Sequence, residues 1–205
     1  MCAGWPVLAG EPIETAFLQV PWPRQIVREL EVGRYPVRWR QRASRQEGVF
    51  AGLEFNAPCS RAQLWQQTTD YAEFQEKVPG VSRVTVREDS PSRRTIDIEM
   101  RVLWRTFRLA FEVEEARAAD HDEIRFRLAH EVIGEYRGIC WLRDPPAAPG
   151  AQPDRARTMV GLATRLQPAR PVPMGLILLT ERMAFLHGIQ NFLESLERTC
   201  YTDAS

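Results

Sequence analysis

Histidine and cysteine are scarce in this chain, and their positions exclude the commonest metal and redox motifs. The 205 residues include three His and four Cys. The cysteines, at positions 2, 59, 140 and 200, lie far apart, without a CxxC pair or a neighbouring His. Zinc sites and catalytic thiol pairs require closer spacing than this. We therefore expect no metal ion and no cofactor, and four free thiols in a reducing compartment.

Long apolar runs and an excess of one charge are also missing. No stretch approaches the roughly 18–20 apolar residues needed to span a bilayer. Lys+Arg and Asp+Glu are equal at 27 each, so the chain creates no net field that attracts nucleic acid or anionic lipid. We therefore predict no nucleic-acid partner and no transmembrane segment, with transient membrane contact left open.

Motifs that carry catalysis are absent as well. The sequence contains no G-x-S-x-G, no H-E-x-x-H, no phosphate-binding loop and no dinucleotide-binding fingerprint. His121 lies in a charged hairpin, and His187 lies one helical turn from Met183, where packing explains it. Neighbouring strand residues face opposite ways, so His130 and Glu131 do not form an acid/base pair. The sequence assigns no catalytic residue and leaves open whether the protein is an enzyme.

The N-terminus bears on localisation and on domain boundaries. Residues 7–9 (VLA) have the small-residue spacing of a secretory cleavage site, but a basic region and a long apolar stretch do not precede them. As written, the sequence predicts a cytoplasmic protein, and export to the periplasm is the alternative if residues 1–10 are the remnant of a signal peptide. The length predicts one main domain. We place an N-terminal extension with an added strand or short helix at 1–47, the domain at 48–199 and a tail at 200–205.

Short elements are expected before the main sheet. Residues 23–30 (PRQIVREL) could form a short helix, and residues 34–40 (RYPVRWR) an extended strand. Residues 49–55 (VFAGLEF) have the β-branched and aromatic content of a strand. A helix follows within residues 56–71, because Ser60 can cap it and several apolar residues share one face. A second short helix, YAEFQEKV, ends at a Pro-Gly pair at 79–80.

From residue 81 the apolar period changes to two. Six segments alternate between apolar side chains and Arg or Glu: 81–88, 95–104, 107–113, 123–132, 136–144 and 157–166. One apolar and one charged face per strand is typical of an antiparallel sheet with one solvated side.

A long amphipathic helix is expected at 174–199, introduced by Pro171 and Pro173. Its apolar arc is unusually wide, so part of it must meet the N-terminal segment, a ligand, a partner or a membrane surface. A sheet with a single apolar face must bury that face, and this helix is the candidate. The predicted fold class is therefore α+β, a helix-grip fold. In it a curved antiparallel sheet wraps around a long C-terminal helix, with two short helices after the first strand.

The order of these elements resembles the START-like superfamily, often called SRPBCC. It is closest to the polyketide cyclase/dehydrase and coenzyme Q-binding branch. Members have a strand ending in Ala-Pro, a helix with a Trp, and then an Asp-Tyr corner that closes with Pro and Val. The matching residues are Ala57, Pro58, Trp65, Asp70, Tyr71, Phe74, Pro79, Val81 and Gly138. The resemblance covers roughly residues 30 to 198. It departs at Ile139, where the family usually has an aromatic residue, with Trp141 two residues on. The resemblance implies that the two short helices form the rim of a cavity mouth.

Strand alternation selects candidate lining residues. Ile98, Leu109 and Leu128 are expected to face inward with several aromatic residues, and Arg137 shares a face with two apolar neighbours on its strand. The predicted ligand-binding residues are Met100, Phe107, Phe111, Phe126, Tyr136, Arg137, Ile139, Trp141, Met159, Leu179, Met183 and Leu186. Plain core is the commoner explanation for each of these residues taken singly, and Arg137 could equally lie on a solvated face.

Three functions fit these expectations. The resemblance favours binding, and transport or sequestration, of a hydrophobic small molecule such as a lipid, isoprenoid or quinone, in a cavity between sheet and helix. The first alternative is a polyketide aromatase/cyclase, in which Arg137, Tyr136 and His130 assist dehydration. The second is a protein-interaction module with a filled cavity.

Overall fold

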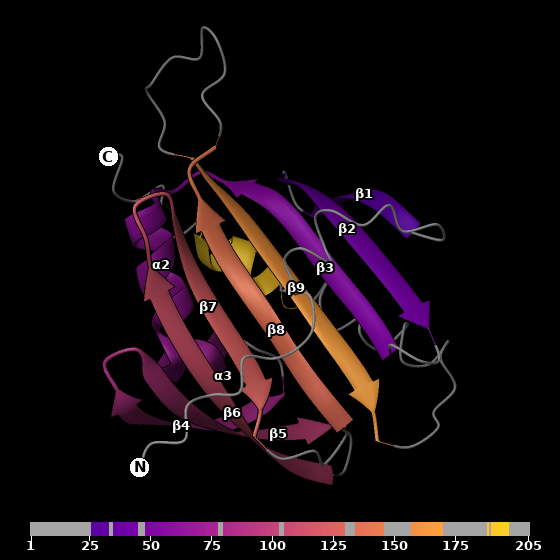
Figure 1. Cartoon of the computed structure of the whole chain (residues 1–205), viewed down its shortest axis with the longest axis vertical. Coiled ribbons are helices and arrows are strands. Elements are labelled where there is room, and N and C mark those ends of the chain that lie inside the picture. Colours follow the sequence, from indigo (N-terminus) through magenta and orange to yellow (C-terminus); the bar gives the residue numbers. More distant parts are fainter. Residues whose placement is uncertain are drawn as a thin grey trace, which may run out of the picture.

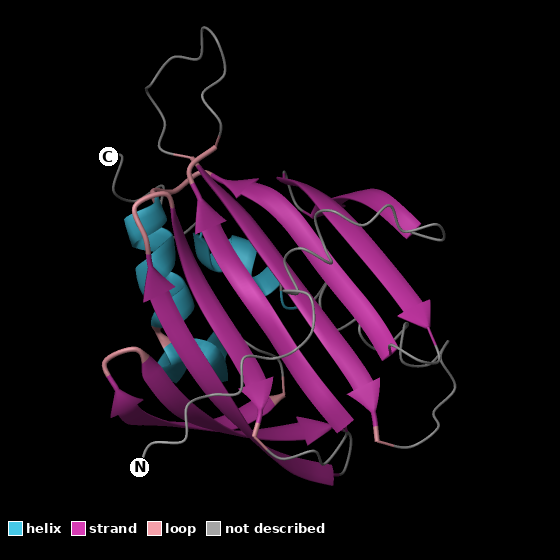
Figure 2. Ribbon diagram, viewed as in Figure 1, coloured by secondary structure: helices cyan, strands magenta, loops and turns pink. Residues whose placement is uncertain are grey.

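The computed structural model describes residues 26–32, 35–44, 48–77, 80–102, 105–129, 134–145, 157–169, 188 and 190–196. Within them the chain builds one antiparallel sheet of nine strands in the order β1-β2-β3-β9-β8-β7-β6-β5-β4. The sheet curves, and the helices lie on one of its sides (Figures 1 and 2). This architecture confirms the predicted curved antiparallel sheet with short helices after a strand.

The strands follow one another along the chain, mostly as neighbours in space. They are β1 (Ile26–Val32), β2 (Tyr35–Ser44), β3 (Gly48–Ala57), β4 (Val81–Ser90), β5 (Arg93–Val102), β6 (Arg105–Arg117), β7 (His121–Leu128), β8 (Gly134–Arg143) and β9 (Thr158–Pro168). The last strand returns to pair with β3, which places β9 and β8 at the centre of the sheet.

Three short helical elements separate β3 from β4. They are α2 (Arg61–Thr69), the 3-10 helix η1 (Tyr71–Glu73) and α3 (Phe74–Lys77). Ser60 caps α2 as predicted: its hydroxyl accepts a hydrogen bond from the Gln63 backbone N–H, and the Gln63 side chain accepts one from the Ser60 backbone N–H. Such a capping box satisfies backbone donors that the first helical turn leaves without partners.

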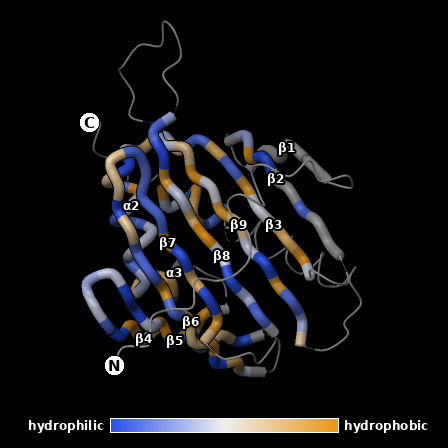
Figure 3. The backbone as a smooth tube through the Cα atoms, viewed as in Figure 1, coloured by the Kyte–Doolittle hydropathy of each residue, from blue (hydrophilic) through white to orange (hydrophobic). Residues whose placement is uncertain are grey.

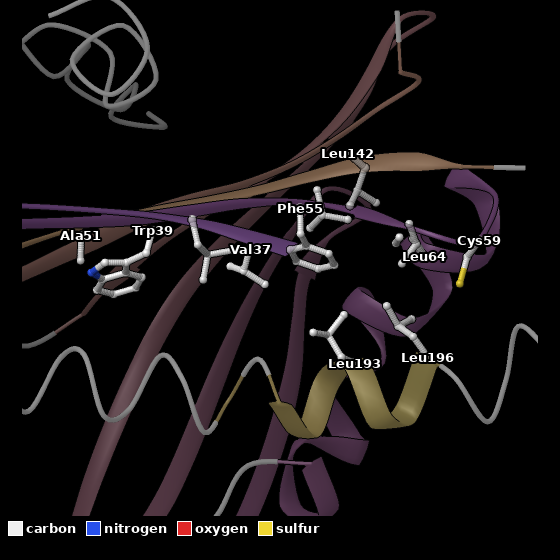
Figure 4. Close-up of a cluster of buried hydrophobic side chains, with 12 residues drawn as sticks. Val37, Trp39, Ala51, Phe55, Cys59, Leu64, Leu142, Leu193 and Leu196 are labelled. Carbon is white, nitrogen blue, oxygen red and sulfur yellow. The ribbon is translucent and has the colours of Figure 1, made fainter. Parts of the chain in front are cut away.

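Two faces of the sheet differ in what they carry. The inner face is defined here as the side that packs against α2 and the helical residues 190–196. Its core joins Leu53 and Phe55 of β3 to Leu193 and Leu196, with Leu64 of α2 beside them (Figure 4). The outer face of β4–β7 carries cross-strand ion pairs, such as Arg127 with Glu112. Residue hydropathy accordingly alternates along the strands (Figure 3).

The structure corrects one element of the N-terminal extension. Residues 26–32 form strand β1, paired with β2, where the sequence predicted a short helix at 23–30. The preference of the segment IVRELEV for helix or strand is weak, and pairing with an available sheet edge decides it. The helix expected at 174–199 lies mostly outside the described residues, of which 190–196 are helical.

The cysteines also depart from expectation. Cys59 is disulfide-bonded, and its partner lies outside the described residues, whereas Cys140 is free. The prediction of four free thiols is therefore wrong for Cys59. Sequence spacing could not reveal the bond, because a disulfide requires the two Cα atoms to come within about 7 Å in the fold.

Candidate functional site

Three aromatic rings form a cluster on the inner face of the sheet. Phe111 of β6, Phe126 of β7 and Tyr136 of β8 are all half-buried. Their ring centroids lie 6.4 Å apart for Phe111 and Phe126, 6.3 Å for Phe111 and Tyr136, and 6.1 Å for Phe126 and Tyr136. Both pairs that include Phe111 pack edge-to-face, and the Phe126–Tyr136 pair is tilted by 45°. Edge-to-face packing stabilises aromatic groups beyond the area they bury. We call these three residues the aromatic cluster.

A glycine supports the aromatic cluster from below. Gly138 lies directly opposite Phe126 in the β7–β8 register. A Cβ atom at position 138 would collide with the Phe126 ring and would approach the Ala163 carbonyl oxygen to 2.8 Å. The missing side chain therefore lets the ring lie against the backbone of β8, which fixes its position in the sheet.

Further apolar side chains extend the cluster along β5 and β6. Met100 lies opposite Phe107, and Ile98 lies opposite Leu109. Each of these four side chains is half-buried. They share the inner face with Phe111, because residues two apart on a strand point the same way. The prediction that alternation directs these residues to one face is confirmed.

A polar group anchors the helical corner above this surface. The Tyr71 hydroxyl of η1 donates a hydrogen bond to Glu115 Oε1 at 2.8 Å. Arg94 Nε lies 3.0 Å from the same carboxylate oxygen, and the Arg94 guanidinium lies 5.9 Å from the centre of the Tyr71 ring. Burial, followed by the charge of Glu115, raises the pKa of Tyr71 well above its ordinary value. The tyrosine therefore stays protonated and acts as a donor.

A second buried ion-pair group fixes the start of α2. Asp122 is 1% exposed, and its carboxylate lies 3.5 Å from Arg61 Nε and 3.3 Å from Arg117 Nε. The Arg117 guanidinium also lies 5.4 Å from the ring centre of Trp65 on α2. Together with the tyrosine group, these contacts hold the helical layer on the sheet at two points.

The alternation of side chains along β5 and β6 could have predicted that these charged groups point inward, but they were not among the predicted residues. Glu115 and Arg94 each lie two residues from an inward apolar neighbour, Val113 and Ile96 respectively. Charged residues at inward positions are a signal of buried pairing. Their partner Tyr71 is known only from the tertiary fold.

The predicted lining residues divide between the two faces. Met100, Phe107, Phe111, Phe126 and Tyr136 lie on the inner face. By the register of β8 and β9, the others that the structure describes lie on the outer face: Arg137, Ile139, Trp141 and Met159. The expectation that all of them line one pocket is corrected accordingly. Strand β8 has apolar side chains on both faces, so its sequence could not show which set points inward.

The outer-face residues have their own packing. Ile139 and Trp141 are 4% and 1% exposed and cluster with Ala163 and half-buried Phe50. Trp141 lies against Gly161, its direct partner on β9, so closely that a Cβ atom there would collide with the indole. Burial lowers the pKa of the Arg137 guanidinium, which pairs with Glu135 at 3.2 Å.

The remaining predicted residues are not placed. Leu179, Met183, Leu186 and the alternative candidate His130 lie outside the described residues. Within the part of the chain that the structure describes, no group of three or more His, Cys, Asp or Glu side chains could hold a metal ion. None of the described helices is long and apolar enough to cross a membrane.

Comparison with known proteins identifies the fold. No family model and no curated protein matches the sequence. A STAR-related lipid transfer protein from Xanthomonas axonopodis is similar in structure, with a TM-score of 0.67 and 12% identity over 84% of this chain and 98% of that chain. A START superfamily protein from Mycobacterium smegmatis has a TM-score of 0.55 at 11% identity, over 73% and 97% of the two chains.

An enzyme has a similar structure as well. The Zhui aromatase/cyclase from Streptomyces sp. R1128 has a TM-score of 0.54 at 14% identity, over 73% of this chain and 93% of that chain. Identities this low establish the architecture alone. The chain has a START-like fold.

Proposed function

We propose that this protein binds a hydrophobic small molecule against the inner face of its sheet and carries or sequesters it. The observation that supports the proposal most is the aromatic cluster, three half-buried rings continued by Met100 and Phe107 on the same face. Small-molecule sites are mostly apolar surfaces with few polar groups. The names of the lipid transfer proteins with the same fold point in the same direction.

Burial of the ligand would supply the affinity. Removing about 300 Å² of apolar surface from water favours binding by roughly 7 kcal/mol, before the cost of ordering both partners. The inner face needs no charged group for such binding, since its described charges are already paired with one another in the tyrosine group and the Asp122 group. We expect the ligand to be apolar over most of its surface.

Catalysis by the polyketide mechanism finds less support in the site. Of the three polar candidates for dehydration, Arg137 lies on the outer face and pairs with Glu135. His130 lies outside the described residues, which leaves Tyr136 as the candidate on the inner face. The Tyr136 hydroxyl alone could contact a ligand, but a single hydroxyl does not make an acid/base pair.

The disulfide at Cys59 bears on the compartment. Disulfides persist in oxidising environments and are rare in the cytosol. The bond at Cys59 therefore favours the exported form of the protein over a cytoplasmic one. Peptide mapping of protein that is alkylated before reduction tests whether Cys59 forms a disulfide.

A pair of matched variants tests which face of the sheet binds the ligand. Phe126→Leu removes a ring from the inner face, and Phe50→Leu removes a half-buried ring from the outer face. We expect Phe126→Leu to weaken the binding of the uncharged fluorescent probe N-phenyl-1-naphthylamine by about 2- to 10-fold, the value of one aromatic contact. Phe50→Leu should leave probe affinity unchanged. Equal effects of the two variants, with both folded by circular dichroism, would contradict the proposal.

A further inference from the structure

One hydroxyl group on the inner face is buried without a hydrogen-bond partner. Thr164 of β9 is 1% exposed, and its Oγ1 atom makes no hydrogen bond. Thr158 lies six residues earlier on the same strand and face and is 0% exposed, yet its Oγ1 donates to the Cys59 carbonyl oxygen at 2.8 Å. Buried polar side chains in folded proteins nearly always have a partner, so an orphan such as Thr164 calls for one.

The surroundings of Thr164 leave little that could be that partner within the sheet. Its direct neighbours on the inner face are Ala51 of β3 and Gly138 of β8, which have no polar side-chain atoms. The cross-strand row on one side contains Leu53, Leu162 and Cys140, and the row on the other side contains Val49, Leu166 and Tyr136. None of these side chains forms a hydrogen bond with Thr164 Oγ1. Ala51, Thr164 and Gly138 lie side by side on three adjacent strands, and each has a small side chain or none. We call these three residues the low strip. This strip ends at Phe126, the ring of the aromatic cluster that lies over Gly138.

The charged groups that the structure describes on the inner face are too far away to contact this hydroxyl. Arg94 shares the row of Thr164, but four strand spacings of about 4.8 Å separate β5 from β9. Asp122 lies opposite Leu142, which lies opposite Val160, four residues along β9 from Thr164. Four residues of a strand span about 13 Å. An ionised ligand group at Thr164 would therefore find no countercharge among the residues that the structure describes, and burying a charge without one is costly.

We infer that Thr164 is the polar contact of the ligand site and takes an uncharged oxygen atom of the ligand, a hydroxyl or a carbonyl. The inference rests on the proposed function and narrows its ligand class. The ligand is an apolar molecule with an uncharged oxygen placed about one strand spacing, or roughly 5 Å, from the part that contacts the Phe126 ring, because that ring lies over Gly138, the direct neighbour of Thr164. Fully apolar hydrocarbons and ionised head groups at this position are excluded from the class.

A double-mutant cycle with two matched probes tests the contact. 2-Naphthol and 2-methylnaphthalene are nearly equal in shape and differ by a hydroxyl in place of a methyl group. Thr164→Val makes the same exchange on the protein. The ratio of the two dissociation constants is measured by isothermal titration calorimetry for wild type and variant, so that the difference in water solubility of the probes cancels.

We expect Thr164→Val to reduce the preference for 2-naphthol by about 2- to 10-fold, the range of one net hydrogen bond. Thr164→Ser keeps the hydroxyl and should keep the preference. Thr158→Val, which removes a hydroxyl that is already satisfied, should lower stability and leave the preference unchanged.

Two other outcomes overturn the inference in different ways. An unchanged preference in Thr164→Val, with both probes still bound, means that the hydroxyl holds a buried water and not the ligand, and the proposed function survives. If wild type binds neither probe at saturating concentration, the apolar site itself is absent and the proposed function falls together with the inference. Melting curves for each variant verify that it is folded.

Discussion

At the scale of single residues, glycine supports an aromatic ring at two places on opposite faces of the sheet. Phe126 lies over Gly138 on the inner face, and Trp141 lies over Gly161 on the outer face. In each case the ring and the glycine are direct partners on adjacent strands. The backbone of the glycine then replaces a side chain as the packing surface, so the ring and the glycine are needed together.

Substitution of Gly161 tests this dependence. Gly161→Ala places a Cβ atom within the Trp141 indole, and overpacking of a buried site commonly costs about 1–3 kcal/mol. Urea denaturation measures the loss in the free energy of unfolding. Gly188→Ala is the matched control, since a Cβ atom at Gly188 meets nothing within 4 Å. Equal stability of the two variants would show that Trp141 has room to move.

Cys140 offers a residue-scale test of burial on the inner face. Desolvation raises the pKa of its thiol to about 12, so at pH 8 only about one molecule in 10,000 carries the reactive thiolate. We expect iodoacetamide to label Cys140 in urea and to leave it unlabelled in the native protein, as read by mass spectrometry of the tryptic peptide. Rapid labelling of the native protein at pH 8 would show that solvent reaches this part of the inner face.

At the scale of elements, the corner between α2 and β4 is held by η1. The Tyr71 hydroxyl bonds to Glu115, its ring packs edge-to-face with Phe74 at 5.5 Å, and Arg94 lies over the ring. The Arg101 backbone N–H then donates to the Gly80 carbonyl oxygen at 2.6 Å, which returns the chain to the sheet. Gly80 has a φ of 85°, a conformation that favours glycine.

Removal of the Tyr71 hydroxyl should loosen this corner in a pH-dependent way. A hydrogen bond to a carboxylate stabilises by about 1.5–3 kcal/mol, so Tyr71→Phe should lower the free energy of unfolding by that amount at pH 8. The folded-state pKa of Tyr71 is raised above that of the unfolded chain, so the folded state retains a proton that the unfolded state loses. Wild-type stability should therefore fall as the pH rises above about 10.

Tyr71→Phe should show a shallower fall over the same interval, because the titrating group is gone. Urea denaturation at pH 8, 9.5 and 10.5 measures both effects. Cys140→Ala serves as a control for the separate alkaline contribution of the thiol. Parallel pH profiles for wild type and Tyr71→Phe would mean that the hydroxyl titrates equally in both states and is not buried against Glu115.

Element order was the part of the fold that the sequence could predict. Alternation from residue 81 onward, the Ser60 cap and the strand at Tyr35–Ser44 all appear as expected. Strand β1 was mistaken for a helix because its pairing with β2 is a tertiary contact. The face of β8 was not predictable, since Tyr136 and Leu142 on one side and Ile139 and Trp141 on the other are all apolar or aromatic. The inward charges of Glu115 and Arg94 could have been found from alternation, but their partner could not.

At the scale of the whole molecule, the two faces of the sheet have different roles. The inner face combines the aromatic cluster, the low strip at Thr164 and the two anchored helical groups, whereas the outer face of β4–β7 is covered by ion pairs. Exposed ion pairs contribute little to stability, typically below about 1 kcal/mol each. The stability of the domain therefore depends mainly on the inner face, which is also where we place the ligand.

Native mass spectrometry of the purified full chain, followed by organic extraction, tests the central claim most directly. We predict that an apolar small molecule containing an uncharged oxygen travels with the protein at near-equal stoichiometry. If no ligand survives purification, incubation with ubiquinone, a fatty alcohol or a sterol should shift the mass by one bound molecule. A protein that keeps its unliganded mass with every one of these compounds would contradict the account.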